Sequence, residues 1–76
     1  MMAETKNTIF RNKSWHVYIG DYHGGRAVVV ESQTHAFVDY PIMYRDGTLA
    51  WDFPERIPDY IKKVVWKHFT GKKRRR

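Results

Sequence analysis

Apolar and polar residues alternate along residues 15–20, which is the pattern of a β-strand with one buried face. Successive side chains of a strand point to opposite sides of a sheet, so a period of two predicts a strand here. Residues 27–31 are rich in valine, which favours strands, and we expect this segment to return alongside the first strand. Residues 1–8 are mostly polar, in contrast, and predict a flexible N-terminus.

Gly24 and Gly25 lie between these two strands and predict a two-residue hairpin turn, because both central residues of such a turn need a positive φ. Counting outward from this turn places Asp21 opposite Val28, which is a poor pair. A bulge, or a shift of the turn by one residue, is therefore an alternative.

Asp46 and Gly47 predict the turn of a second hairpin, because an Asp-Gly pair is among the strongest short signals for such a turn. Counting outward from this turn places strand-forming or large apolar side chains on one face of the hairpin: Tyr40, Ile42, Tyr44, Leu49, Trp51 and Phe53. Turn chemistry and the apolar pattern agree on one register, so we expect this face to be apolar and paired. Pro41 marks an edge or a bend, because proline cannot donate to a strand ladder.

Residues 58–71 have the spacing of a helix with one buried face. The side chains of that face recur at intervals of three and four residues: Ile61, Val64, Val65, His68 and Phe69. Pro58 suits the first turn of a helix and Gly71 suits its end, so these residues set the predicted limits. Asp52 and Glu55 have the spacing of a capping box, and residues 53–57 predict a separate single turn.

The predicted order is four strands followed by one helix, which makes the chain an α+β protein. Seventy-six residues allow one small domain, which we place at residues 9–71. We expect a four-stranded antiparallel meander, either open with one face under the C-terminal helix or closed into a small barrel. Twelve aromatic residues are more than one helix can cover, so some must fill a barrel, a dimer seam or a binding surface.

Composition excludes several classes of protein. There are no cysteines, so neither a disulfide framework nor a thiolate metal site can stabilise the chain. No apolar run approaches the roughly 18 residues of a membrane span, and residues 1–7 lack the apolar core of a signal peptide. We therefore expect an intracellular protein that does not enter a membrane and is cytoplasmic or, in a nucleated host, nuclear.

Positive charge is concentrated at the C-terminus. The formal net charge is +6, and five of the fourteen basic residues follow one another there: Lys72, Lys73, Arg74, Arg75 and Arg76. Such a run repels itself and cannot pack, so we expect residues 72–76 to form a disordered basic tail. A basic tail is typical of contact with nucleic acid, but it also occurs as a solubilising end or a nuclear-import signal.

Trp66 is the most informative single residue. In the predicted helix it lies outside the apolar arc, among Lys62, Lys63, Lys67 and Thr70. An indole among lysines can stack on a base while the cations contact phosphates. The alternative is that Trp66 packs against the N-terminal segment or a second subunit, because large aromatic side chains are usually buried.

The strands supply a second candidate surface. Tyr18 and Tyr22 share the side of the first strand that faces away from the predicted core. Phe37 and Met43 lie on the side of the second hairpin that faces away from its apolar residues. We expect these side chains to bind a protein partner if the sheet stays open.

No catalytic, cofactor or metal motif stands out. The histidines do not have the spacing of metal ligands: His16, His23, His35 and His68. Asp21, His23 and Arg26 could be drawn as a ribonuclease site, but turns are rich in such residues. We therefore expect no enzyme activity, no cofactor and no metal.

The sequence thus predicts a small non-enzymatic protein that binds DNA or RNA with low sequence specificity. Its interface would consist of the helix lysines, Trp66 and the basic tail. The alternative is a protein-binding regulator or inhibitor module, for example one encoded by a virus or a mobile element. A homodimer is compatible with both hypotheses.

Overall fold

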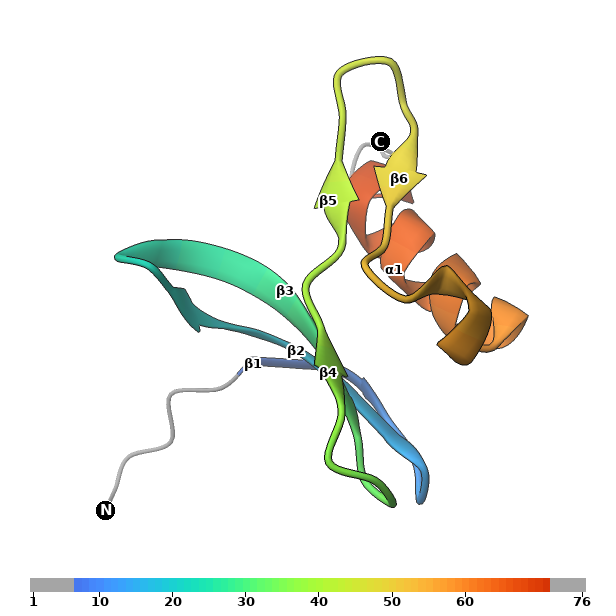
Figure 1. Cartoon of the computed structure of the whole chain (residues 1–76). Helices are drawn as coiled ribbons and strands as arrows, with labels where there is room; N and C mark the ends of the chain where they lie inside the picture. The colour runs from blue at the N-terminus through green and yellow to red at the C-terminus, as the bar shows by residue number, and fades with distance from the viewer. Residues whose placement is uncertain (1–6, 72–76) are drawn as a thin grey trace.

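The computed structural model describes residues 7–71, and four strands of one antiparallel sheet come first along this chain (Figure 1). They pair in sequence order: β1 (Asn7–Arg11), β2 (Trp15–Tyr22), β3 (Gly25–Ser32) and β4 (Val38–Asp39). A separate two-stranded sheet, a 3-10 turn and a helix follow: β5 (Ile42–Met43), β6 (Leu49–Ala50), η1 (Pro54–Arg56) and α1 (Asp59–Gly71). The predicted α+β fold, a four-stranded antiparallel sheet followed by one C-terminal helix, is confirmed, and the sheet is open rather than barrel-shaped.

The segments that form the outer strands differ from the prediction. β1 begins at Asn7, inside the segment 1–8 whose polar composition predicted flexibility, and it pairs with β2. β5 and β6, which were predicted to extend the main sheet, form a small sheet of their own. Residues 1–6 and the predicted basic tail, 72–76, lie outside the described residues.

The first hairpin turns one residue earlier than the glycine pair predicts. β2 and β3 are joined by His23 and Gly24, whose φ angles are 48° and 81°. The shift places Asp21 opposite Arg26 instead of Val28, so a poor pair is replaced by residues of opposite charge. The one-residue shift is therefore the correct alternative.

The second hairpin has its turn at the predicted place but a register that differs by one residue. The Gly47 N–H donates to the Tyr44 carbonyl (3.0 Å), and the Tyr44 N–H donates to the Thr48 carbonyl (2.8 Å). Three residues rather than two therefore form the loop, and Gly47 takes the left-handed position with a φ of 91°. As a result Met43 lies opposite Leu49, the position that the sequence predicted for Tyr44.

This change of register splits the predicted apolar face of the hairpin. Leu49 and Trp51 pack against the core, whereas Ile42, Tyr44 and Phe53 are exposed. Side chains alternate along a strand, so one extra loop residue separates Ile42 and Tyr44 from Leu49 and Trp51. Phe53 is exposed for a different reason, since it lies beyond β6 at the start of η1. The prediction that all these residues share one face is therefore wrong.

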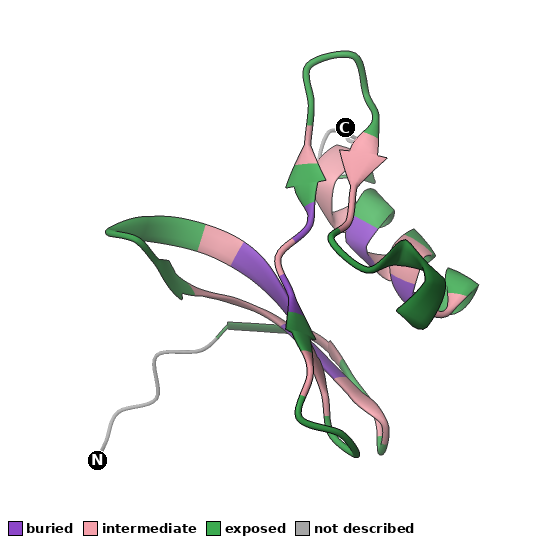
Figure 2. Cartoon of the chain, in the orientation of Figure 1, coloured by how far each residue is buried: buried purple, intermediate pink, exposed green. Residues whose placement is uncertain are grey.

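The core lies between one face of the main sheet and the elements that follow it (Figure 2). Its buried side chains come from β2, β3, the chain before the helix and α1: Val17, Val28, Val30, Ile57, Ile61 and Val65. The rest of the predicted helical arc, Val64, His68 and Phe69, is partly buried. The 3.6-residue period of the sequence therefore identified the inner face of α1 correctly.

The start of α1 also follows the prediction. The Pro58 carbonyl accepts hydrogen bonds from the N–H groups of Ile61 (3.0 Å) and Lys62 (3.1 Å), so the helix begins directly after the proline. The short turn η1 matches the single turn predicted before it. The predicted capping box is wrong, because no side chain caps η1.

Asp39 joins the main sheet to the segment that leads into the helix. Its side chain is fully buried, and its two carboxylate oxygens accept hydrogen bonds from the backbone N–H groups of Asp52 (3.1 Å) and Phe53 (3.0 Å). Asp39 itself lies in β4, opposite Val30 of β3. A buried carboxylate needs such partners, so these two bonds fix the position of the connection relative to the sheet.

We expect Asp39→Ala to lower the free energy of unfolding by about 1–3 kcal/mol, because two backbone N–H groups lose their acceptor. Urea unfolding followed by circular dichroism measures the change. Asp46→Ala is the matched control, since the exposed Asp46 carboxylate also accepts one backbone N–H, that of Thr48 (2.9 Å). Its effect should be smaller, and equal effects would contradict the role assigned to Asp39.

We expect Gly47→Ala to destabilise the protein by about 1–2 kcal/mol, because a side chain makes the left-handed conformation unfavourable. Gly25→Ala is the control, since Gly25 begins β3 without a positive φ and a Cβ there would lie 3.8 Å from its nearest neighbour. That variant should stay within about 0.5 kcal/mol of the parent. Thermal melts compare the two, and a neutral Gly47→Ala would disprove the three-residue loop.

Candidate functional site

The outward face of α1 brings together the helix residues that the sequence predicts to contact nucleic acid. Lys63, Trp66 and Lys67 are exposed, and Lys62 is partly exposed. Lys62 and Lys63 precede Trp66 by one helical turn, so their Cβ atoms lie on the same side of the helix as the indole. The arrangement therefore places an aromatic ring among three ammonium groups.

The aromatic ring of α1 that contacts β1 is not that of Trp66, contrary to the alternative in which Trp66 packs against the N-terminal segment. That place belongs to Tyr60, whose ring meets the Phe10 ring edge to face with centroids 6.2 Å apart. The Asn12 side-chain amide also donates to the Tyr60 hydroxyl (3.0 Å). Trp66 stays 48% exposed beside the lysines, whereas Tyr60, although 47% exposed, contacts Phe10 and Asn12.

A groove of about 370 Å³ lies at the C-terminal end of α1. Arg26 of β3 lines this groove together with His68 and Phe69 of the helix. The basic residues 72–76 follow α1 directly in sequence but lie outside the described residues. Residues 7–71 contain eight Lys and Arg against seven Asp and Glu, so the described part is nearly neutral and the lysine face is a local concentration of charge.

The sheet face that α1 does not cover carries a layer of tyrosine rings. Tyr22 of β2 and Tyr40, which follows β4, stack with centroids 4.3 Å apart. Tyr18 lies beside them, and its ring leans over Gly20, where a Cβ would lie 3.0 Å from a ring carbon. Beneath this layer Val29 is only 3% exposed although no helix covers it. The rings thus act as the cover of this face.

The predicted partner-binding residues do not form one surface. Tyr18 and Tyr22 lie on the open face, as predicted. Phe37 instead packs toward the core, with its ring 6.2 Å from that of Trp15. Met43 lines the groove beside the C-terminal end of α1. Tyr40 belongs to the open face but was assigned to the apolar face of the second hairpin, because the sequence alone does not reveal that β4 ends before Tyr40.

Burial raises the pKa of Tyr18 above its ordinary value of 10.0. The Glu31 carboxylate raises this pKa further, through its negative charge and by accepting a hydrogen bond, and nearby Tyr40 adds to the effect. Glu31 lies on the neighbouring strand opposite His16, whose Nε2 is 2.9 Å from the Thr8 hydroxyl. The open face is therefore a polar network under aromatic rings rather than an apolar patch.

We expect the stability of the protein to fall in alkaline solution as Tyr18 ionises. The pKa of Tyr18 is raised in the folded state, so the folded protein holds the hydroxyl proton more tightly than the unfolded chain does. The resulting contribution to stability is complete below about pH 10, the ordinary pKa of tyrosine, and is lost as pH rises through the folded pKa. Glu31→Gln should lower the pKa of Tyr18 without restoring its ordinary value, because burial remains. Carbon-13 NMR of the tyrosine Cζ atoms measures this pKa, with Tyr18→Phe identifying the signal. An unchanged Tyr18 pKa in Glu31→Gln would contradict the pairing.

The groups that could support catalysis or metal binding are dispersed. Among residues 7–71, no cluster of three or more His, Cys, Asp or Glu side chains could hold a metal ion. The His23 ring packs against Tyr22, with centroids 4.4 Å apart, while Asp21 and Arg26 pair across the strands. Within the same described part, no helix is both long enough and apolar enough to cross a membrane.

Comparison with known proteins adds no family to this picture. No protein-family model, curated protein or solved structure matches the chain. The function has to be inferred from the surfaces themselves.

Proposed function

We propose that the protein binds nucleic acid, without enzymatic activity, through the outward face of α1 and the basic segment that follows it. The observation that supports this most is Trp66, which is 48% exposed among Lys62, Lys63 and Lys67. A base stacked on an aromatic side chain contributes about 1–3 kcal/mol, and ammonium groups at one turn's distance suit the phosphates on either side of that base. The described body supplies the stacking surface.

The basic residues 72–76 would supply most of the electrostatic attraction. Each cation that meets a phosphate releases a counterion, so affinity of this kind depends on salt and not on base sequence. α1 offers one aromatic ring and three lysines on its outward face, and these side chains do not form a recognised base-reading motif. We therefore propose low sequence specificity and leave DNA and RNA as outcomes of the test.

The first test is titration of the full chain with labelled single- and double-stranded oligonucleotides at low salt. Truncation after Gly71 removes five positive charges, so affinity should fall while the melting temperature hardly changes. If every cation contacts a phosphate, the salt slope on duplex DNA should flatten by up to about four to five units. Absence of binding at micromolar protein concentration would refute the proposal.

Trp66→Ala separates the aromatic contribution from the cationic one. It should weaken single-strand binding by about 1–3 kcal/mol and leave the salt slope nearly unchanged. Tyr44→Ala is the matched control, because Tyr44 is an aromatic residue that is 54% exposed in the second hairpin, away from the lysines. Equal losses in both variants would contradict a specific stacking role for Trp66.

The open sheet face favours a second candidate function, a protein-binding regulator or inhibitor module. Tyr22 and Tyr40 present stacked rings there, and Val38 beside them is exposed. Tyrosine is enriched at protein interfaces, and this face points away from α1. Binding of a protein partner that Tyr22→Ala abolishes and truncation after Gly71 leaves intact would favour this candidate. The same variant measured by analytical ultracentrifugation tests a homodimer.

A further inference from the structure

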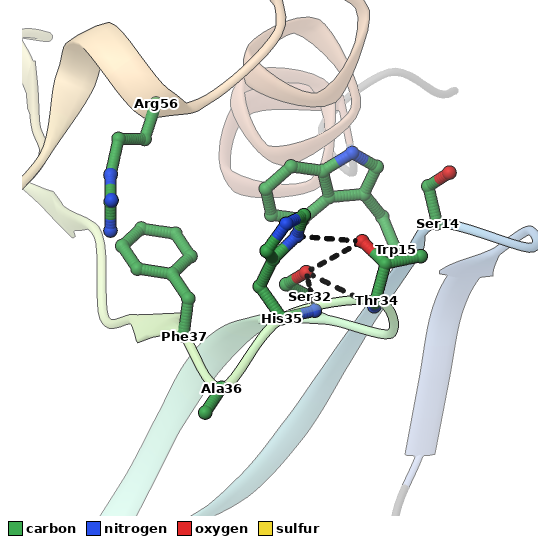
Figure 3. A pocket seen from close by; sticks show the side chains of 8 residues that line it. All are labelled: Ser14, Trp15, Ser32, Thr34, His35, Ala36, Phe37 and Arg56. Carbon is green, nitrogen blue, oxygen red and sulfur yellow. Dashed lines mark hydrogen bonds between the residues drawn. The ribbon is translucent and has the colours of Figure 1, made fainter.

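A cavity of about 510 Å³ lies between the loops at one end of the main sheet and η1, away from the surfaces described above (Figure 3). It combines a cation, hydroxyl groups and aromatic rings: Trp15, Ser32, Thr34, His35, Phe37 and Arg56. No residue that lines it has a carboxylate. Its volume is in the range of small-molecule sites, and its charge suits an anion.

Arg56 is positioned as an anion-binding group. Its guanidinium carbon lies over the Phe37 ring, 5.1 Å from the ring centre, which is the distance of a cation–π contact. This contact uses the positive charge of the group and leaves its N–H donors for a ligand. An arginine held in this way can bind the oxygens of a phosphate with two parallel hydrogen bonds.

Hydrogen bonds within the loop after β3 orient His35 in the same cavity. The Ser32 hydroxyl oxygen accepts the N–H groups of Thr34 (3.2 Å) and His35 (3.0 Å). It also lies 3.4 Å from the Thr34 hydroxyl, which in turn lies 2.9 Å from His35 Nδ1. Nδ1 is thus occupied by the Thr34 hydroxyl, which leaves Nε2 as the ring nitrogen of His35 that can meet a ligand.

The rings that line the cavity suit a planar ligand. The Trp15 and Phe37 rings meet edge to face at 6.2 Å, and Phe53 meets Phe37 at 5.5 Å on the side of η1. Trp15 and Phe37 both pack against the core, so the positions of these two rings are set before a ligand arrives. Arg56 and His35 line the same cavity as these rings, so a flat aromatic group that lies against Trp15 or Phe37 would carry its phosphate into the cavity that both polar side chains line.

We propose that this cavity binds a nucleotide, with the phosphate held by Arg56 and Nε2 of His35 and the base packed against Trp15 and Phe37. The nucleotide could come from solution or from the phosphorylated end of a strand, since both present the same phosphate and base. The site uses none of the residues on the outward face of α1. It therefore does not depend on the function proposed for that face.

Titration of the full chain with AMP, followed by proton–nitrogen NMR, tests the proposal. The indole N–H signals of Trp66 and Trp51 are assigned with Trp66→Phe and Trp51→Phe, which leaves the remaining signal for Trp15. We expect AMP to shift the Trp15 signal saturably and adenosine to bind at least about tenfold more weakly, since it has no phosphate. No saturable shift below about 10 mM AMP, equal binding of adenosine, or a shift confined to Trp66 would overturn the proposal.

Arg56→Ala should weaken AMP binding by about ten- to a hundredfold, the effect of losing a charged hydrogen-bond donor. Arg45→Ala is the matched control, because it removes the same charge from the exposed loop of the second hairpin. His35→Ala tests the second polar side chain of the site, which is also exposed. Melting temperatures equal to that of the parent protein show that all variants fold. Unaltered AMP binding in both Arg56→Ala and His35→Ala would overturn the assigned site.

Competition by oligonucleotides with a 5′-phosphate or a 5′-hydroxyl identifies the source of the nucleotide. If only the phosphorylated strand competes with AMP, the site binds a strand end. If neither strand competes, the site binds free nucleotide.

Discussion

The buried carboxylate of Asp39 determines how the two parts of this molecule meet. A charged group that is removed from water must have its oxygens satisfied, and here the partners are the N–H groups of Asp52 and Phe53. The sheet that contains Asp39 thereby fixes the chain just before η1 and α1. Once that connection is placed, Ile57 and Ile61 close over Val17 and Val30, and the apolar core forms on one side of the sheet. This geometry also determines which side of α1 and which face of the sheet point toward solvent.

Because one helix can cover only one face of an open sheet, the other face needs its own cover. Tyr18 provides part of it by leaning over Gly20, which leaves no room for a Cβ at that position. Large aromatic rings above glycines compensate in this way for the missing side chain in a strand. Val29 is buried as a result, and the layer keeps hydroxyl groups at its edge. Three of the twelve aromatic residues, Tyr18, Tyr22 and Tyr40, thus lie on the sheet face that the helix leaves open.

The sequence was most informative where a pattern is local. The inner face of α1 and its start after Pro58 depend on spacing and on the chemistry of proline, and both were predicted correctly. Both hairpins were found. The register of the first was among the predicted alternatives, whereas that of the second was missed, because a loop one residue longer leaves the composition unchanged. β1 was missed because its residues are mostly polar and half exposed, as in an edge strand with a bulge after Thr8. Asp39 could not be identified as a buried link, since its partners are 13 and 14 residues away and donate through the backbone.

The candidate site illustrates the same division between local and tertiary information. Helical periodicity alone placed Trp66 among lysines on an outward face, and the exposed indole agrees with that placement. The cavity at Arg56 needed tertiary structure, because its lining comes from three segments that are separate in sequence, residues 14–15, residues 32–37 and Arg56. Charge attraction by a basic segment acts over about 10 Å at moderate salt, whereas stacking and bidentate hydrogen bonds act only in contact. If the basic residues attract nucleic acid as proposed, the contacts that select a ligand would come from the near-neutral body, through its lysine face, its stacked tyrosine face and its carboxylate-free cavity.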